Sequence, residues 1–156
     1  MKRSLCSLFV LLLTSYSCTL DPQSKELDSD DFSTANERIT VLMREIVSHS
    51  DITKAEFELF NVNGFSNSSV SIPGASYWDY KMALQVPLAE VGQWTNGMTK
   101  VATLKNDLEW ITQIIEQRKK EWKTNSPPEF FIEEGAKTIA VVYKEEGIVF
   151  KRILRD

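Results

Sequence analysis

Few side chains in this chain have the types and spacing that catalysis requires. Glu109 and Glu116 lie seven residues apart in a segment predicted to be helical, which would place both carboxylates on one helix face, about 10 Å apart along its axis. Paired carboxylates can serve a hydrolase, but two solvated surface charges give the same pattern. His49 is the only histidine, and its neighbours in the sequence include no partner for catalysis or metal binding. We therefore predict no catalytic residue, metal or cofactor, with a periplasmic hydrolase using carboxylates as an alternative.

Three aspartates near the N-terminus, Asp28, Asp30 and Asp31, suggest the start of a calcium-binding loop. Such a loop needs glycine at its sixth position and a bidentate glutamate at its twelfth. Counted from Asp28, these positions hold Ser33 and Ile39. The pattern therefore does not predict a calcium site.

The N-terminus has the features of a secretory signal peptide over residues 1–17. Lys2 and Arg3 give it a positive start, and the apolar run that follows is too short to span a bilayer. Two small residues, Ser15 and Ser17, then stand three and one positions before Cys18. The leader resembles a bacterial lipoprotein signal, in which the cysteine after the cleavage site is acylated and becomes the new N-terminus.

This resemblance implies that Cys18 carries lipid, such as palmitate, and anchors the protein in a membrane of the cell envelope, facing the periplasm or the outer surface. Lipidation also explains the odd cysteine. After cleavage Cys18 would be the only thiol, which cannot form an internal disulfide. Ordinary secretion as a soluble protein is the alternative.

Charge and composition divide the rest of the chain into a tether and a domain. Loss of Lys2 and Arg3 would reduce the 18 basic residues by two against 22 acidic ones, leaving a net charge of about −6. Such a chain is poorly suited to nucleic acid and better suited to a basic protein partner. Residues 18–32 are polar and acidic, which predicts a flexible tether. Residues 33–156 are enough for a single domain with its own core.

Regular patterns predict the first elements of this domain. Thr34 and Glu37 form a capping box, and apolar residues at three- and four-residue spacing predict a helix that starts at Thr34 and has His49 at its C-terminal end. Alternation predicts strands over residues 54–62 and 77–86, the second being the longest and the centre of the sheet.

Helices and strands also follow in the second half. Pro87 begins a short helix, and residues 106–124 predict a long one, from whose apolar stripe Trp110 projects as a candidate exposed contact. Arg152 interrupts an apolar strand face, which predicts an edge position or a salt bridge. The expected strands are residues 129–132, 136–143 and 148–154, the last two forming a hairpin with Gly147 in the left-handed position of its turn.

Together these elements predict an α+β fold, with a mainly antiparallel sheet of about four to five strands and two long helices packed on one face. Each long helix and each strand has an apolar face that should contribute to one core. We therefore expect four residues to be buried together: Trp78, Leu84, Ile115 and Phe150.

The serine-rich loop over residues 63–76 is the longest polar interruption between the expected elements, and none of its serines has the Gly-x-Ser-x-Gly context of a nucleophile. The sequence thus predicts a non-enzymatic, lipid-anchored cell-envelope protein that binds a protein or a cell-wall partner. An immunity protein against a basic periplasmic toxin is a further alternative. The candidate binding residues are Phe65, Ser66, Asn67, Ser68, Ser69 and Trp110.

Overall fold

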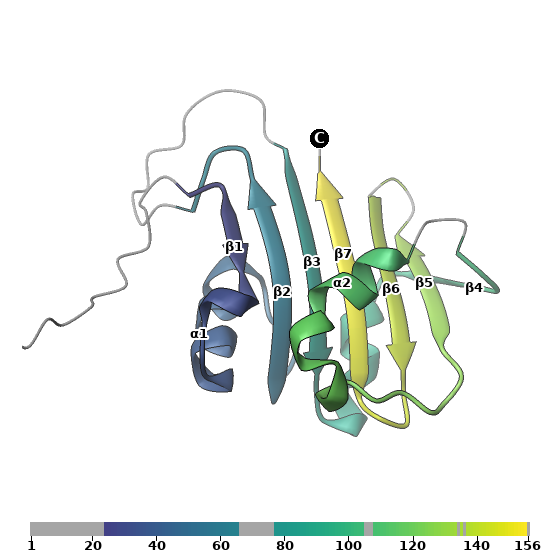
Figure 1. Cartoon of the computed structure of the whole chain (residues 1–156). Helices are drawn as coiled ribbons and strands as arrows, with labels where there is room; N and C mark the ends of the chain where they lie inside the picture. Colours follow the sequence, from purple (N-terminus) through teal and green to yellow (C-terminus); the bar gives the residue numbers. More distant parts are fainter. Residues whose placement is uncertain (1–23, 66–76, 105–107, 134, 136, 156) are drawn as a thin grey trace, which may run out of the picture.

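A computed structural model describes residues 24–65, 77–104, 108–133, 135 and 137–155. Within these residues seven strands form one antiparallel sheet, in the spatial order β1-β2-β3-β7-β6-β5-β4 (Figure 1). The strands are β1 (Glu26–Asp28), β2 (Lys54–Asn61), β3 (Trp78–Gln85), β4 (Thr99–Val101), β5 (Glu129–Glu133), β6 (Lys137–Tyr143) and β7 (Ile148–Arg155).

Five helical segments accompany the sheet in the described part of the chain. None of them is long and apolar enough to cross a bilayer. The two longest are the α-helix α1 and the 3-10 segment η2. The segments are η1 (Ser29–Asp31), α1 (Ala35–Glu45), η2 (Leu88–Thr95), α2 (Glu109–Ile114) and η3 (Glu116–Glu121).

β3 is a central strand, as its long alternating pattern predicts. All eight of its residues pair with β2 on one side and with β7 on the other. The capping box that begins α1 is also confirmed, because Thr34 Oγ1 accepts a hydrogen bond from the backbone N–H of Glu37 and the Glu37 carboxylate accepts one from the N–H of Thr34. In the β6–β7 hairpin Gly147 has a φ of +68°, the left-handed conformation expected.

Helices cover both faces of the sheet rather than one. α1 and η2 lie on one face of the sheet, and α2 and η3 lie on the other (Figure 1). Side chains alternate along β3 and β7, so Leu84 packs under α1 and η2, whereas Phe150 packs under α2 and η3. The prediction that Trp78, Leu84, Ile115 and Phe150 are buried together is therefore wrong, and Trp78 itself is only half-buried. A strand that is buried on both faces needs a covering layer on each side. Consecutive residues of β6 are buried, which is the pattern of such a strand.

The predicted sheet of four to five strands with two long helices on one face is corrected in two further respects. The two strands that the sequence did not predict, β1 and β4, are three-residue edge strands, too short for alternation to be recognisable. The long helix expected over residues 106–124 is two short segments, α2 and η3. Inside η3, Arg118 leaves helical geometry, with φ −123° and ψ 25°, and its side chain binds Glu56 of the sheet. Tertiary contacts here override helix propensity.

Part of the segment assigned to the tether belongs to the folded unit. Residues 26–28 pair with β2, and Leu27 is buried in the core. Asp28 caps η1 by accepting a hydrogen bond from the backbone N–H of Asp30. Leu27, the ladder of backbone hydrogen bonds and the ion pair between Asp30 and Arg118 hold a segment that composition alone marks as polar.

Candidate functional site

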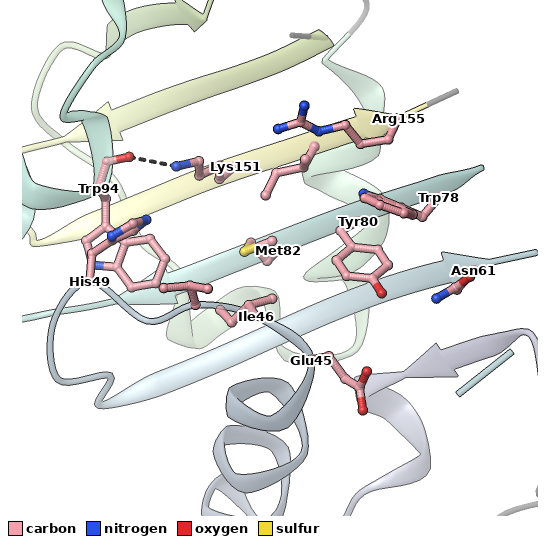
Figure 2. Close-up of a pocket in the computed structure, with 12 residues that line it drawn as sticks. Glu45, Ile46, His49, Asn61, Trp78, Tyr80, Met82, Trp94, Lys151 and Arg155 are labelled. Carbon is pink, nitrogen blue, oxygen red and sulfur yellow. Dashed lines mark hydrogen bonds between the residues drawn. The ribbon is translucent and has the colours of Figure 1, made fainter. Parts of the chain in front are cut away.

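A pocket of about 410 Å³ opens on the sheet face that α1 and η2 cover (Figure 2). Strands β2, β3 and β7 form its floor, and the register places Tyr80 opposite Ile153 and Met82 opposite Lys151. Its volume lies in the range of small-molecule sites. We call it the aromatic pocket and define it by Trp78, Tyr80, Met82, Trp94, Lys151 and Ile153.

Local sequence explains how the pocket is assembled. The period of two along β3 points Trp78, Tyr80 and Met82 to the same face. Pro87 then ends the strand, and η2 carries Trp94 back over the sheet, where its indole Nε1 donates a 2.8 Å hydrogen bond to Ser50 Oγ.

Aromatic rings stand at both ends of the pocket (Figure 2). At one end the rings of Trp78 and Tyr80 lie 6.4 Å apart between centroids. At the other, His49 meets Trp94 edge to face at 5.2 Å and 87°. The rings of Trp78, Tyr80 and Trp94 are large and rigid, so they present flat surfaces that lose little conformational entropy when a ligand binds.

Lys151 is a buried cation in this pocket. Its side chain lies on the floor, the residue is 8% exposed, and Nζ donates a 2.9 Å hydrogen bond to the backbone oxygen of Trp94. Among the described residues no carboxylate forms an ion pair with it. Burial lowers the pKa of the Lys151 amine, because the charged form loses its hydration.

Basic groups outnumber acidic ones among the described lining residues. His49 and Arg155 join Lys151, while Glu45 is the one carboxylate. Partial burial, followed by the positive charge of Lys151, lowers the pKa of His49, and burial raises the pKa of Glu45. With Lys151 and Arg155 opposed by Glu45, the pocket lining carries a small positive charge within a chain of net negative charge, which favours an anionic group on a ligand.

The predicted site residues are not brought together. Phe65 is half-buried, and its ring lies 6.0 Å from that of Tyr80, so the start of the serine-rich loop touches the pocket wall. Ser66, Asn67, Ser68, Ser69 and the predicted lipidation site Cys18 lie outside the described residues.

Trp110 was predicted as an exposed contact, and this prediction is wrong. Trp110 is 4% exposed and packs with Ile114 and Trp122 against the opposite face of the sheet from the pocket. The apolar stripe predicted over residues 106–124 requires one straight helix. The helix ends at Ile114, so residues on either side of this break do not share one stripe, and Trp110 faces the sheet.

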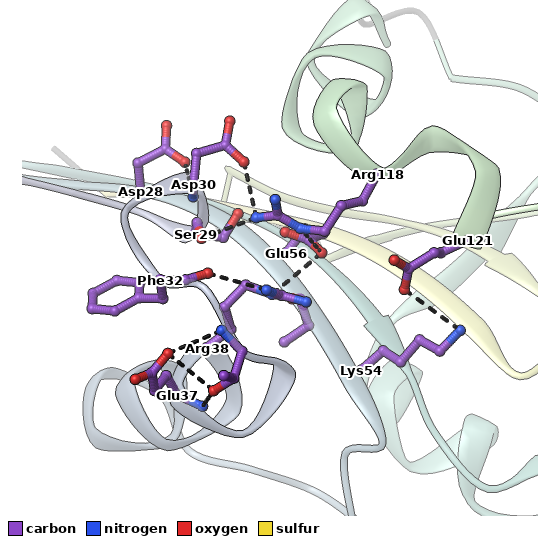
Figure 3. Close-up of polar contacts among 12 residues, drawn as sticks. Asp28, Ser29, Asp30, Phe32, Glu37, Arg38, Lys54, Glu56, Arg118 and Glu121 are labelled. Atoms are coloured by element: carbon purple, nitrogen blue, oxygen red, sulfur yellow. Dashed lines mark hydrogen bonds and ion pairs between the residues drawn. The ribbon is translucent and has the colours of Figure 1, made fainter.

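A second cluster of charged side chains has a structural role (Figure 3). Glu56 on β2 is 2% exposed and accepts a 2.8 Å hydrogen bond from Arg118 Nε, while Arg38 Nε lies 3.4 Å from the same oxygen. Arg118 also pairs with Asp30 at 2.9 Å. The network joins α1, β2, η1 and η3, and each guanidinium contacts a carboxylate of the chain itself.

The two carboxylates that the sequence suggests for a hydrolase do not line the pocket. Glu109 and Glu116 lie on α2 and η3, on the face of the sheet that the pocket does not share. In the described part of the chain no group of three or more His, Cys, Asp and Glu side chains could hold a metal ion.

The sequence does not indicate Lys151 as a site residue, because Ile148 and Phe150 predict that the opposite face of the last strand is the buried one. The other face, with Val149, Lys151 and Ile153, is also covered. A lysine between two apolar residues of the same face was the available signal.

The chain matches no protein-family model, no curated protein and no solved structure at a significant level.

Proposed function

We propose that this chain is a non-enzymatic, lipid-anchored cell-envelope protein that acts by binding, and that the aromatic pocket is its binding site. The observation that carries the proposal is a concave pocket built on three central strands, with aromatic rings at both ends. Sites on strands hold their side chains more rigidly than sites on loops. Few convergent polar groups in an apolar pocket are typical of ligand recognition.

The anchor follows from the leader, in which Cys18 directly follows a small-x-small sequence. Several acyl chains, each burying many methylenes at about 0.8 kcal/mol apiece, would hold the protein stably in a membrane. Cys18 lies six residues before Ser24, and six residues reach at most about 20 Å. The pocket would therefore remain close to the membrane surface.

Metabolic labelling with a clickable fatty acid tests the anchor. Wild-type protein should be labelled, and Cys18→Ala should not. Equal labelling of both proteins would exclude lipidation at Cys18.

Capture from envelope extracts tests the binding site. The full chain, wild type or Ile153→Trp, is immobilised, and retained proteins and small molecules are identified by mass spectrometry. Ile153→Trp adds a ring at the pocket floor and should lose the ligand. Leu88→Trp adds the same ring at a position that is 63% exposed and outside the pocket, and should keep it. Retention of every bound species by Ile153→Trp would show that the pocket is not the site.

The alternatives have less support. An immunity protein for a basic toxin would need an acidic surface, and a hollow of about 310 Å³ beside β1 is lined by Glu26, Asp28, Glu58 and Asp79. However, Glu58 already pairs with Lys81 and Asp79 with Arg152. A hydrolase using Glu109 and Glu116 would need both carboxylates in one pocket, and neither lines the aromatic pocket or the hollow beside β1.

A further inference from the structure

The amine of Lys151 forms no ion pair with a described carboxylate, and the charge of Glu133 acts on it only from a longer distance. Burying a cation is costly unless an anion accompanies it, and one backbone carbonyl supplies only part of that compensation. Met82 lies directly across the strand pair, and the buried Trp94 covers the amine from η2. An anionic group that entered the pocket would complete the coordination of Lys151.

The second cation on this face of β7, Arg155, is too distant to share that anion. Lys151 and Arg155 lie on the same face of the strand, four residues apart, which corresponds to about 13 Å. Arg155 is exposed, whereas Lys151 is buried, so Arg155 can attract an anion at the mouth while Lys151 holds it inside.

The space between Lys151 and Arg155 suits a flat, apolar part of a ligand. Trp78 and Tyr80 stand at the Arg155 end, and Trp94 with His49 stands at the Lys151 end (Figure 2). The thioether of Met82 lies on the floor between them, and sulfur makes favourable contacts with aromatic rings. These surfaces favour an aromatic ring system over a hydrated or strongly polar one.

Resting on the proposed function of the aromatic pocket, we propose that its ligand is a small aromatic anion. A carboxylate or phosphate monoester binds Lys151 Nζ, and the ring system lies over Met82 between Trp78 and Trp94. The charge of Lys151 favours an anionic head group on the ligand, and the aromatic residues favour its ring system.

Calorimetric titration with naphthalene probes tests this proposal. The full chain carries Cys18→Ala, so that no attached lipid competes for the pocket. The probes are 2-naphthoate, 2-naphthyl phosphate, the neutral isostere 2-naphthamide and the cation 2-naphthylmethylammonium. One of the two anions should bind at least about tenfold more tightly than the amide, the size expected for a charge-assisted hydrogen bond, and the cation should bind more weakly than the amide. Which anion binds more tightly distinguishes carboxylate from phosphate recognition.

Two variants that each remove one positive charge test whether Lys151 causes the preference for anionic probes. Lys151→Met should reduce anion affinity to that of the amide and leave amide affinity unchanged. Lys123→Met, at an exposed position on the chain, should change neither. Thermal unfolding checks that both variants are folded.

The outcomes separate this inference from the proposed function. If the amide binds as tightly as both anions, or Lys151→Met leaves anion affinity intact, head-group selection by Lys151 is wrong, although the pocket still binds. If no naphthalene probe binds, the aromatic anion is excluded as the ligand class. Capture of a different ligand that Ile153→Trp loses would then leave the pocket as the binding site.

Discussion

Arg118 Nε lies 2.8 Å from Oε1 of Glu56, and this contact ties the helical layer of η3 to the sheet. Glu56 is buried on β2, near the edge of the sheet, where Arg38 of α1 reaches the same oxygen. One carboxylate thereby connects elements from both helical layers. The same contact accompanies the break in the helix that the sequence predicted as continuous.

Removing the charge of Glu56 should destabilise the fold. Glu56→Gln leaves the guanidinium groups of Arg38 and Arg118 without their shared anion, and breaking a buried ion pair from one side costs about 3 kcal/mol. The free energy of unfolding from urea titrations measures the loss. Glu58→Gln is the matched control on the same strand. Its side chain is 44% exposed and pairs with Lys81, so its loss should stay below about 1 kcal/mol. Equal losses would show that the Glu56 network contributes no more than a surface ion pair.

Trp110 should behave as a core residue rather than a binding residue. Trp110→Ala opens a cavity under α2 and should lower the free energy of unfolding by about 3 to 5 kcal/mol. Trp110→Phe keeps most of the packing and should cost much less. A Trp110→Ala protein with unchanged stability but lost ligand binding would contradict the structure and restore the exposed placement.

A side chain at Gly147 should lower the free energy of unfolding. Its φ is +68°, and a Cβ built on it would overlap the carbonyl oxygen of Val86. Gly147→Ala should therefore lower stability by about 1 to 3 kcal/mol. Gly92→Ala is the control, because that glycine has no heavy atom within 4 Å of its built Cβ and no positive φ. The melting temperatures of the two variants are compared by thermal unfolding. Equal melting temperatures would refute the predicted strain at Gly147.

Lys151 should make stability depend on pH in the alkaline range. Burial lowers its pKa in the folded state below the ordinary 10.5, so between these two values the unfolded chain binds more protons. The free energy of unfolding should therefore rise with pH across that window, since deprotonation relieves the buried charge. Lys151→Met should be at least as stable at neutral pH and should lack this rise. Other groups, including Tyr80, titrate in both proteins and cancel in the comparison. Parallel pH profiles would show that the amine is not buried in solution.

Patterns that depend on neighbouring residues were readable from the sequence. The capping box of α1, the alternation of β3 and the left-handed glycine of the β6–β7 turn are each set by side chains a few residues apart. The prediction of a salt bridge for Arg152 is also confirmed, because its guanidinium pairs with Asp79 across the strands. The acylation of Cys18 remains a prediction from the leader alone.

Features that depend on which surfaces meet were decided by the tertiary structure. Leu84 and Phe150 occupy opposite faces because β3 and β7 are buried on both sides, and periodicity does not report which layer covers a face. The three-residue strand β1 forms because β2 offers it hydrogen bonds and a place for Leu27. The binding site follows the same logic. Lys151 looks like a solvated charge in the chain, and it becomes a buried cation among aromatic rings only when η2 places Trp94 over β7.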